Sequence, residues 1–198
     1  MRGERTSAIR LGVAITLLVS WSATPVRAVT AQWASPELRP SVGVYVPTGP
    51  HDDLLERGPV FGGQVAVELR PALHAVFGFG WVATEERQAT PTRRIEMAQF
   101  DLGVEWLRHD RDRRELRMTP FLGGGIGLRA YRSRDADAPS QANVAGYGAL
   151  GIEIGTGAVG VRLEGRDYLT AFRGLDGADG TSLRNDVMVV VGVGLRLR

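Results

Sequence analysis

The segment from Val187 to Leu197 alternates between two kinds of side chain. Every second residue from Val187 onward is valine or leucine, whereas the positions between them hold Met188, Val190, two glycines and Arg196. Because a β-strand points alternate side chains to opposite faces, one face of this strand is wholly apolar and the other carries glycine and charge. The charged residues lie on the glycine-rich face, whose small side chains suit a narrow interior. In a soluble barrel the charged residues lie on the outer face instead. This partition indicates a barrel whose outer surface meets lipid.

Seven further segments show the same period of two. The eight expected strands are residues 39–48, 61–70, 72–84, 95–108, 116–132, 144–155, 159–170 and 185–197. Most of them are about 9–13 residues long, near the ~9–11 residues that a tilted membrane strand needs. The sequence therefore predicts an all-β fold, an eight-stranded antiparallel up-and-down transmembrane β-barrel.

The two faces of these segments differ in charge. On the outward face the only charged residue is Asp167, which we expect at or above the outer membrane interface because it comes late in its strand. The expected barrel-interior charge network has equal numbers of acids and arginines: Glu68, Arg70, Asp101, Glu105, Arg129, Glu153, Arg162, Glu164, Arg166 and Arg196. Equal numbers favour mutual pairing, because a lone ion in a low-dielectric space is costly.

The connections between the segments alternate in length. Short ones contain residues 71, 109–115 and 156–158, and longer ones, rich in Asp, Gly, Pro, Ser and Thr, cover residues 49–60, 85–94, 133–143 and 171–184. In outer-membrane barrels the short turns face the periplasm and the long loops face outward. Outward aromatic residues at both ends, Phe61 and Trp81 near the loops and Trp106 near the turns, match the two interfacial girdles of such barrels.

Residues 1–31 are expected to be a signal peptide, and residues 32–198 the outer-membrane β-barrel domain. Three arginines precede an apolar run over residues 11–23, which is too short to span a bilayer as a helix. Cleavage after Ala28 or after Ala31 satisfies the small-residue rule, and we favour Ala31.

The charge balance of the mature chain excludes one class of partner. Removing the four arginines and one glutamate of residues 1–31 leaves 20 basic and 21 acidic residues, so the pI near 9.5 reflects the signal peptide. We expect no nucleic-acid partner. The chain has no cysteine, so neither a disulfide nor a thiolate site is possible. We expect no metal site, no cofactor and no catalytic residue.

Several polar groups allow a chemical interpretation beside a structural one. His74 and Ser41 both face inward near the periplasmic end and could form a nucleophile–base pair, but we favour an interior polar histidine. The aspartates of residues 176–180 supply few of the six to eight oxygens that calcium needs, so we favour a solvated loop. The glycines of residues 123–127 make room for interior side chains and do not form a phosphate loop. Three arginines are expected near lipopolysaccharide phosphates: Arg132, Arg134 and Arg173.

Three stretches of the chain are similar to parts of known barrels. Residues 43–49 are similar to a first strand that enters its outer loop, and residues 162–168 to a charged penultimate strand. Gly192, Leu195 and Leu197 are similar to a C-terminal insertion signal, although such signals usually end on an aromatic residue and this one does not. The chain thus resembles the outer-membrane β-barrel family of small eight-stranded barrels, the OmpA, OmpX and OmpW type.

The resemblance implies a location and a set of partners. The expected location is the cell outer membrane of a Gram-negative-type bacterium, reached by export through the signal peptide. The implied partners are outer-membrane lipid and lipopolysaccharide, with the barrel-assembly machinery and periplasmic chaperones during biogenesis.

The function that the sequence favours is non-enzymatic. It is a structural, envelope or surface-interaction role through four extracellular loops. The alternative is a narrow OmpW-like conduit for small or hydrophobic solutes. A gated path could be lined by the inward row of Arg162, Glu164, Arg166 and Tyr168. A lipid-modifying enzyme is a third hypothesis. A soluble lipocalin-type barrel is a fourth, and it predicts an apolar interior, which is the opposite of the pattern.

Overall fold

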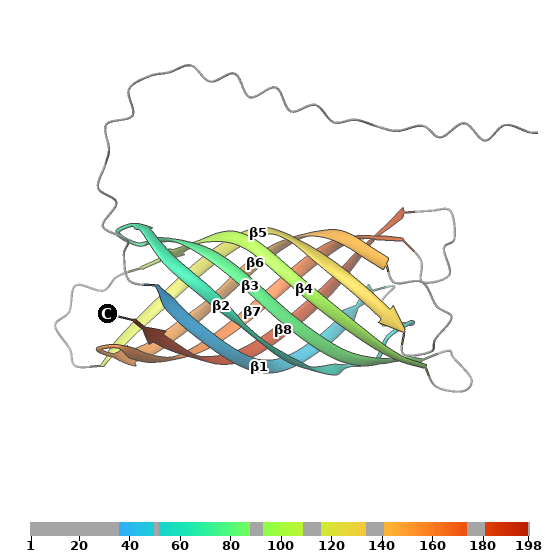
Figure 1. Cartoon of the computed structure of the whole chain (residues 1–198), viewed down its shortest axis with the longest axis horizontal. Coiled ribbons are helices and arrows are strands. Elements are labelled where there is room, and N and C mark those ends of the chain that lie inside the picture. Colours follow the sequence, from blue (N-terminus) through green and yellow to red (C-terminus); the bar gives the residue numbers. More distant parts are fainter. Residues whose placement is uncertain are drawn as a thin grey trace, which may run out of the picture. The chain divides into compact units, whose positions relative to one another are not determined.

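The computed structural model describes residues 36–49, 52–87, 93–108, 116–133, 141–173 and 181–197, so the expected signal peptide and its cleavage sites lie outside the described residues. Eight strands follow one another along the chain (Figure 1): β1 (Glu37–Thr48), β2 (Gly58–Arg70), β3 (Leu73–Glu86), β4 (Arg93–Leu107), β5 (Arg117–Ser133), β6 (Gln141–Thr156), β7 (Val159–Arg173) and β8 (Thr181–Arg196). No helix in this part of the chain is long and apolar enough to cross a membrane.

The sheet closes on itself. Each strand pairs antiparallel with its neighbours in sequence, and β8 pairs with β1. Closure gives every strand a partner on both sides and removes free sheet edges. Glu37 at the start of β1 lies opposite Arg196 at the end of β8, at the same end of the barrel as the short turns at residues 71–72 and 157–158. We call this the turn end and the opposite one the loop end. The predicted eight-stranded antiparallel up-and-down barrel is confirmed.

All eight expected strands are present, and several extend further toward the loop end. β2 begins at Gly58 rather than residue 61, β6 at Gln141 rather than 144, and β8 at Thr181 rather than 185. The added residues pair with neighbouring strands, as Arg184 does with Thr170. Backbone pairing thus continues where the alternation of polar and apolar side chains stops, so the alternation places the loop-end limits of these three strands too early.

The turn between β2 and β3 differs from the expectation. Residue 72 was expected in the third strand, but Ala72 follows Pro71 in a two-residue turn and has a φ of 70°, a region that non-glycine residues seldom adopt. Gly157, with a φ of 59°, has the same role between β6 and β7 without a steric cost. A β-bulge between Glu68 and Arg70 precedes the first turn and breaks the alternation there.

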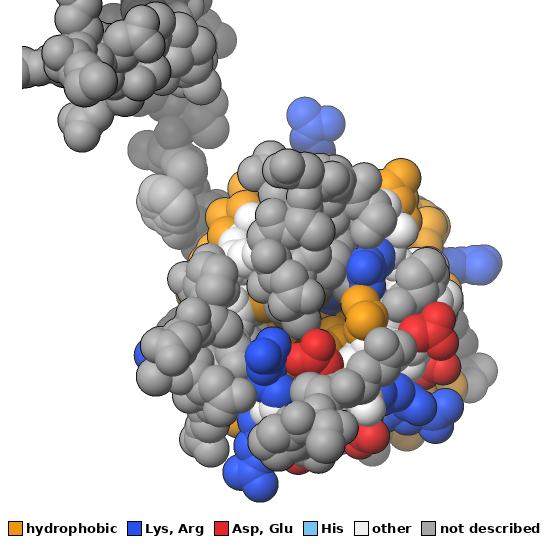
Figure 2. Space-filling model, turned by 90° about the vertical axis from the view of Figure 1, so that its right-hand side faces the viewer, with side chains coloured by type: hydrophobic (Ala, Val, Ile, Leu, Met, Phe, Trp, Pro, Cys, Tyr) orange, Lys and Arg blue, Asp and Glu red, His pale blue; other side chains and the backbone are white. Residues whose placement is uncertain are grey.

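Elsewhere the side chains sort between the two faces as the alternation predicts. Outward residues such as Phe79 on β3 and Leu150 on β6 are 55% and 65% exposed, whereas inward Arg129 on β5 is 0% exposed. Looking onto the loop end, acidic and basic side chains gather around the mouth of the barrel, and hydrophobic side chains appear at its outer margin (Figure 2). The polar groups of the interior therefore lie inside an apolar outer surface.

Apolar and aromatic side chains fill the interior near the loop end. The cluster consists of Tyr45, Leu55, Val60, Val82, Ile95, Met97, Tyr131, Ala145, Tyr168, Met188 and Val190. Leu55 belongs to the connection between β1 and β2 and forms an isolated bridge with Glu86. The amide of Glu56 donates to the carbonyl of Glu85 at 2.8 Å. These bonds attach the connection to the end of β3 and bury Leu55 in the cluster.

Candidate functional site: the charged interior of the barrel

Arg39 joins two carboxylates near the turn end. Its Nε donates to Glu37 Oε1 at 3.0 Å on the same strand, and its Nη1 donates to Glu105 Oε1 at 3.0 Å on β4. The side-chain oxygen of Gln64 accepts a further bond from Nη1 at 3.4 Å. All four side chains are buried, so each charge is compensated by protein partners rather than by water.

Arg162 of β7 lies at the centre of the network. Its two terminal nitrogens donate to the two carboxylate oxygens of Glu105, and its Nε donates to Glu164 Oε2 at 2.9 Å. The guanidinium carbon lies 3.3 Å from the centre of the Phe121 ring. A planar guanidinium can make paired hydrogen bonds and stack on an aromatic ring at once, which an ammonium group cannot do. This geometry requires arginine rather than lysine at position 162.

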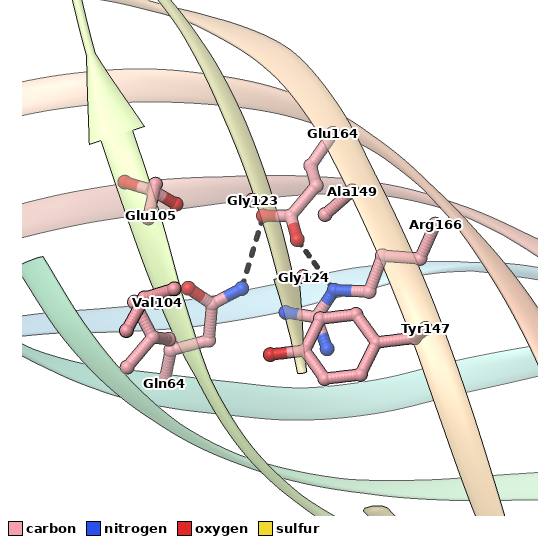
Figure 3. Close-up of a pocket in the computed structure, with 10 residues that line it drawn as sticks. Gln64, Val104, Glu105, Gly123, Gly124, Tyr147, Ala149, Glu164 and Arg166 are labelled. Atoms are coloured by element: carbon pink, nitrogen blue, oxygen red, sulfur yellow. Dashed lines mark hydrogen bonds and ion pairs between the residues drawn. The ribbon is translucent and has the colours of Figure 1, made fainter. Parts of the chain in front are cut away.

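The network continues toward the loop end through Arg166. Its Nε contacts Glu164, and its Nη1 lies 2.9 Å from Asp101 Oδ2. The Tyr168 hydroxyl donates to the same Asp101 oxygen at 2.7 Å, and Gln64 Nε2 donates to Glu164 Oε2 at 3.0 Å. Figure 3 shows Glu164 held between Gln64 and Arg166. The residues that line this point come from six successive strands, β2 to β7.

A second ion pair lies nearer the loop end. Arg129 Nη1 is 2.6 Å from Asp186 Oδ2, and both side chains are 0% exposed. The Tyr45 hydroxyl donates to Asp186 Oδ1 at 2.8 Å. The Arg129 guanidinium also lies over the Tyr168 ring, 4.0 Å from its centre. Tyr168 therefore connects the two ion groups, because its hydroxyl binds one and its ring contacts the other.

Arg196 marks the mouth at the turn end. Its Nη2 lies 2.6 Å from Glu153 Oε1, and its Nε lies 3.4 Å from Glu37 Oε2. The Arg196 side chain is 47% exposed, whereas both carboxylates are buried. The charged network thus runs from a water-accessible arginine at the turn end to the buried pair near the loop end.

Interior glycines make room for these large side chains. A Cβ at Gly103 would overlap the Tyr147 hydroxyl, and a Cβ at Gly151 would overlap the Phe121 ring on which Arg162 stacks. The interior is filled closely enough that a cavity of about 10 Å³ beside Tyr147 has room for roughly one water molecule (Figure 3). The arrangement provides fixed, mutually neutralising charges.

The structure brings most of the expected interior residues together. Seven of them lie buried within this network: Asp101, Glu105, Arg129, Glu153, Arg162, Glu164 and Arg166. Arg196 lies at the mouth. Glu68 and Arg70 are exposed at the turn end and form no ion pair with the described network. Glu68 keeps its inward register opposite His74 but lies at the open end of the barrel, whereas the bulge after it places Arg70 opposite the outward Leu73.

Three charged residues of the network were missing from the expected set. They are Glu37, Arg39 and Asp186. Glu37 precedes the expected start of the first strand. Arg39 and Asp186 lie inside the expected strands, on the same inward face as Ser41 and Met188. Applying the alternation from the first residue of each expected strand would find both.

The other candidates from the sequence are the His74–Ser41 pair, the arginines near the loops and the aspartates of residues 176–180. No hydrogen bond joins His74 to Ser41 in the described structure, although both lie on the interior face. Arg132 is exposed beside the end of β5, whereas residues 176–180 and Arg134 lie outside the described residues. Within the described ranges, no group of three His, Asp or Glu residues is arranged to hold a metal ion.

The interfacial aromatic candidates and two of the three C-terminal candidates face outward. Phe61 and Trp81 are paired across β2 and β3 near the loop end, with ring centres 6.2 Å apart. Trp106 lies near the turn end, 55% exposed. In the candidate insertion signal, Leu195 and Leu197 are exposed. Gly192 is buried against β1, where a Cβ would lie 2.9 Å from the Pro40 carbonyl oxygen.

Three solved outer-membrane proteins have a fold similar to that of this chain. Neisserial surface protein A is 10% identical with a TM-score of 0.63, covering 82% of this chain and 97% of that chain. The outer membrane protein OprG from Pseudomonas aeruginosa is 9% identical with a TM-score of 0.58, covering 84% and 97%. The N-terminal β-barrel domain of Pseudomonas aeruginosa OprF is 12% identical with a TM-score of 0.54, covering 84% and 100%. The chain has the fold of small eight-stranded outer-membrane β-barrels. No protein-family model matches the sequence, and no curated protein matches it.

Proposed function

We propose that this protein is an integral outer-membrane barrel with a structural or surface-interaction role and no enzymatic activity. The observation that carries the proposal is the inverted partition of side chains. We call the exposed apolar residues on the middle of the strands the apolar belt: Val42, Val44, Phe77, Phe79, Phe100, Leu102, Leu122, Ile126, Leu128, Leu150, Val161, Leu163, Val189 and Val191. A soluble protein seldom exposes a continuous apolar surface of this extent.

Closure of the sheet supports the same location. In hydrocarbon, an unpaired backbone amide or carbonyl has no water to bind, so only helices and closed barrels span membranes. Here every strand is paired on both sides, and the buried ion pairs lie inside the barrel. The aromatic pair of Phe61 and Trp81 toward the loop end and Trp106 toward the turn end suit the two interfaces of a bilayer.

The charged interior favours a plug over a conduit. A continuous aqueous path would have to pass Arg162, which bonds both Glu105 and Glu164, and then Arg166. Separating such buried pairs leaves uncompensated charge in a low-dielectric space. We therefore infer that the barrel stabilises its own fold in the membrane and acts through the connections at its loop end.

Lipopolysaccharide is the lipid that we infer beside the loop end. A groove of about 400 Å³ at the loop ends of β2, β3 and β4 is lined by Trp81 and by the arginines Arg57 and Arg94. Three carboxylates also line it: Glu56, Glu85 and Glu96. Arginine binds phosphate oxygens well, and tryptophan prefers the interface between hydrocarbon and head groups. Co-purifying lipopolysaccharide should decrease in the double variant Arg57→Gln/Arg94→Gln, with Arg108→Gln at the turn end as the matched control. Equal amounts in both variants would contradict the inference.

Fractionation and gel mobility test the proposed location. The protein produced in a Gram-negative host should appear in the outer-membrane fraction and migrate differently before and after heating in SDS. A closed barrel resists SDS until heated, whereas a soluble protein does not. Recovery in the soluble fraction, or a single band at all temperatures, would refute the proposal.

Planar-bilayer recording separates the plug from the conduit. The purified protein should produce no stepwise conductance, because the ion pairs of Arg162 and Arg166 occupy the interior. Reproducible single-channel steps from a preparation that shows the heat-dependent mobility would instead support the conduit.

A further inference from the structure

The groove at the loop ends of β2, β3 and β4 carries more negative than positive charge. Two arginines and three glutamates line it: Arg57, Arg94, Glu56, Glu85 and Glu96. All five side chains are exposed or half-buried. An unsubstituted phosphate has a charge of about −1.5 to −2 at pH 7, so the three carboxylates oppose its attraction to the arginines. The lining is therefore not complementary to a phosphate alone.

Charges of both signs are available to a ligand in this groove. Arg94 lies opposite Glu85 in the register, with Nε and Oε1 3.7 Å apart, and both side chains are well exposed. Such a pair contributes little to stability, so a ligand can replace it at little cost. Within the ranges that the structure describes, Glu56 and Arg57 have no ion-pair partner. A ligand that carries one charge of each sign matches this arrangement.

The charged part of the groove lies at the level of lipid head groups. Trp81 also lines the groove, and Glu85 lies four residues beyond it toward the loop end of β3. On β4, Glu96 and Arg94 lie beyond Ala98, the residue paired with Trp81. Because tryptophan favours the boundary between hydrocarbon and head groups, the charges face the head-group layer.

Hydrogen bonds fix one edge of the groove. The Glu56 amide donates to the Glu85 carbonyl at 2.8 Å, and the Thr84 hydroxyl donates to the Glu56 carbonyl at 2.5 Å. These bonds hold residue 56 beside the end of β3. The volume of about 400 Å³ falls in the range of small-molecule sites. The groove is thus preformed and has room for a lipid head group.

We propose that this groove binds a phosphoethanolamine group carried by lipopolysaccharide. Esterification of a phosphate with ethanolamine removes one negative charge and adds an ammonium group two carbons away. The phosphate oxygens bind Arg57 and Arg94, and the ammonium group binds Glu56 or Glu96. Arg94 and Glu96 are two residues apart on one face of β4, about 7 Å, which this short zwitterion and its two contacts span. The proposal rests on the outer-membrane location and on the lipopolysaccharide inferred above.

A divalent cation shared between the carboxylates and a phosphate fits the groove less well. Calcium needs six to eight oxygen ligands. Among the residues that the structure describes, no group of three acids or histidines is arranged to hold a metal ion. An ammonium group needs only hydrogen-bond acceptors, which a single carboxylate supplies.

Native mass spectrometry of the purified, heat-modifiable barrel tests the proposal. The probes are two lipopolysaccharide preparations that differ only in whether their phosphates carry ethanolamine. We expect the substituted form to bind about tenfold more tightly, the effect of one added charge-assisted contact. Glu56→Gln/Glu96→Gln should weaken binding of the substituted form and strengthen binding of the unsubstituted form, because it removes two negative charges. Glu68→Gln, at an exposed glutamate of the turn end, is the matched control and should change neither.

The outcomes separate this proposal from the inferences on which it rests. Equal binding of the two forms, or a preference that survives Glu56→Gln/Glu96→Gln, would overturn it, while lipopolysaccharide binding that still needs Arg57 and Arg94 would leave the earlier inference intact. A preference that disappears in EDTA would indicate a metal bridge and would overturn it too. A chain that fails to reach the outer membrane would overturn the proposed function as well.

Lipid extracted with the barrel from cells identifies the source of the head group. In cells that contain both forms of lipopolysaccharide, the bound lipid should be enriched in the substituted form relative to the whole outer membrane. Enrichment of phosphatidylethanolamine instead, which carries the same head group on a phospholipid, would overturn lipopolysaccharide as the source.

Discussion

Breaking the ion pair between Arg129 and Asp186 is the sharpest test of how the interior stabilises the barrel. The two charged atoms are 2.6 Å apart, and both side chains are fully buried. At an effective dielectric constant of about 20, Coulomb's law gives an attraction of about 6 kcal/mol at this separation. When one partner of a buried pair is removed, the protein and nearby water relax around the remaining charge. The loss of unfolding free energy is therefore smaller, about 3–5 kcal/mol, and we expect a loss of that size here.

In a double-mutant cycle, the single variants should lose more unfolding free energy than the double variant. Arg129→Met leaves Asp186 with the Tyr45 hydroxyl but without its closest cation, and Asp186→Leu leaves Arg129 over the Tyr168 ring without its anion. Each single variant should lose about 3–5 kcal/mol of unfolding free energy. The double variant removes both charges and should lose less than either, because no buried ion remains uncompensated.

Urea unfolding of the barrel in lipid vesicles, followed by tryptophan fluorescence and gel mobility, measures these free energies. Arg94→Met is the control, because Arg94 forms a 3.7 Å pair with Glu85 in which both side chains are well exposed. That variant should change stability by less than about 1 kcal/mol. If the two interior single variants simply add in the double variant, the pair is not coupled and the reasoning is wrong.

Three further predictions concern packing and assembly. Gly103→Val should destabilise the purified barrel by about 1–3 kcal/mol in the same unfolding assay, because its side chain overlaps Tyr147, whereas Gly148→Val should be neutral; equal effects would contradict the assignment of interior and exterior glycines. Leu55→Ala should cost about 2 kcal/mol and increase protease cleavage of the connection between β1 and β2, since Leu55 anchors it in the loop-end cluster; unchanged cleavage would show that other bonds suffice. Leu195→Asp should lower the fraction of heat-modifiable barrel in cells, while Leu195→Val should not, and normal assembly of the aspartate variant would argue against an insertion signal.

The alternation of side chains was enough to predict the number of strands, their order and the faces of most residues. This succeeds because a strand has an exact period of two, and a barrel with one apolar face repeats that period in every strand. It fails where the period is interrupted or its contrast fades. The bulge after Glu68 moved Arg70 to the outward face, and fading contrast at the start of the first strand concealed Glu37.

What only the tertiary structure decided is which charges meet and how deep each residue lies. The sequence determined that arginines and carboxylates share the inner face, but not that Arg162 would bridge Glu105 and Glu164 while stacking on Phe121. These contacts depend on the stagger between strands, because a tilted, closed sheet brings together residues whose positions along their own strands differ. The local pattern sets the face of a side chain, and the register of the whole barrel sets its neighbours.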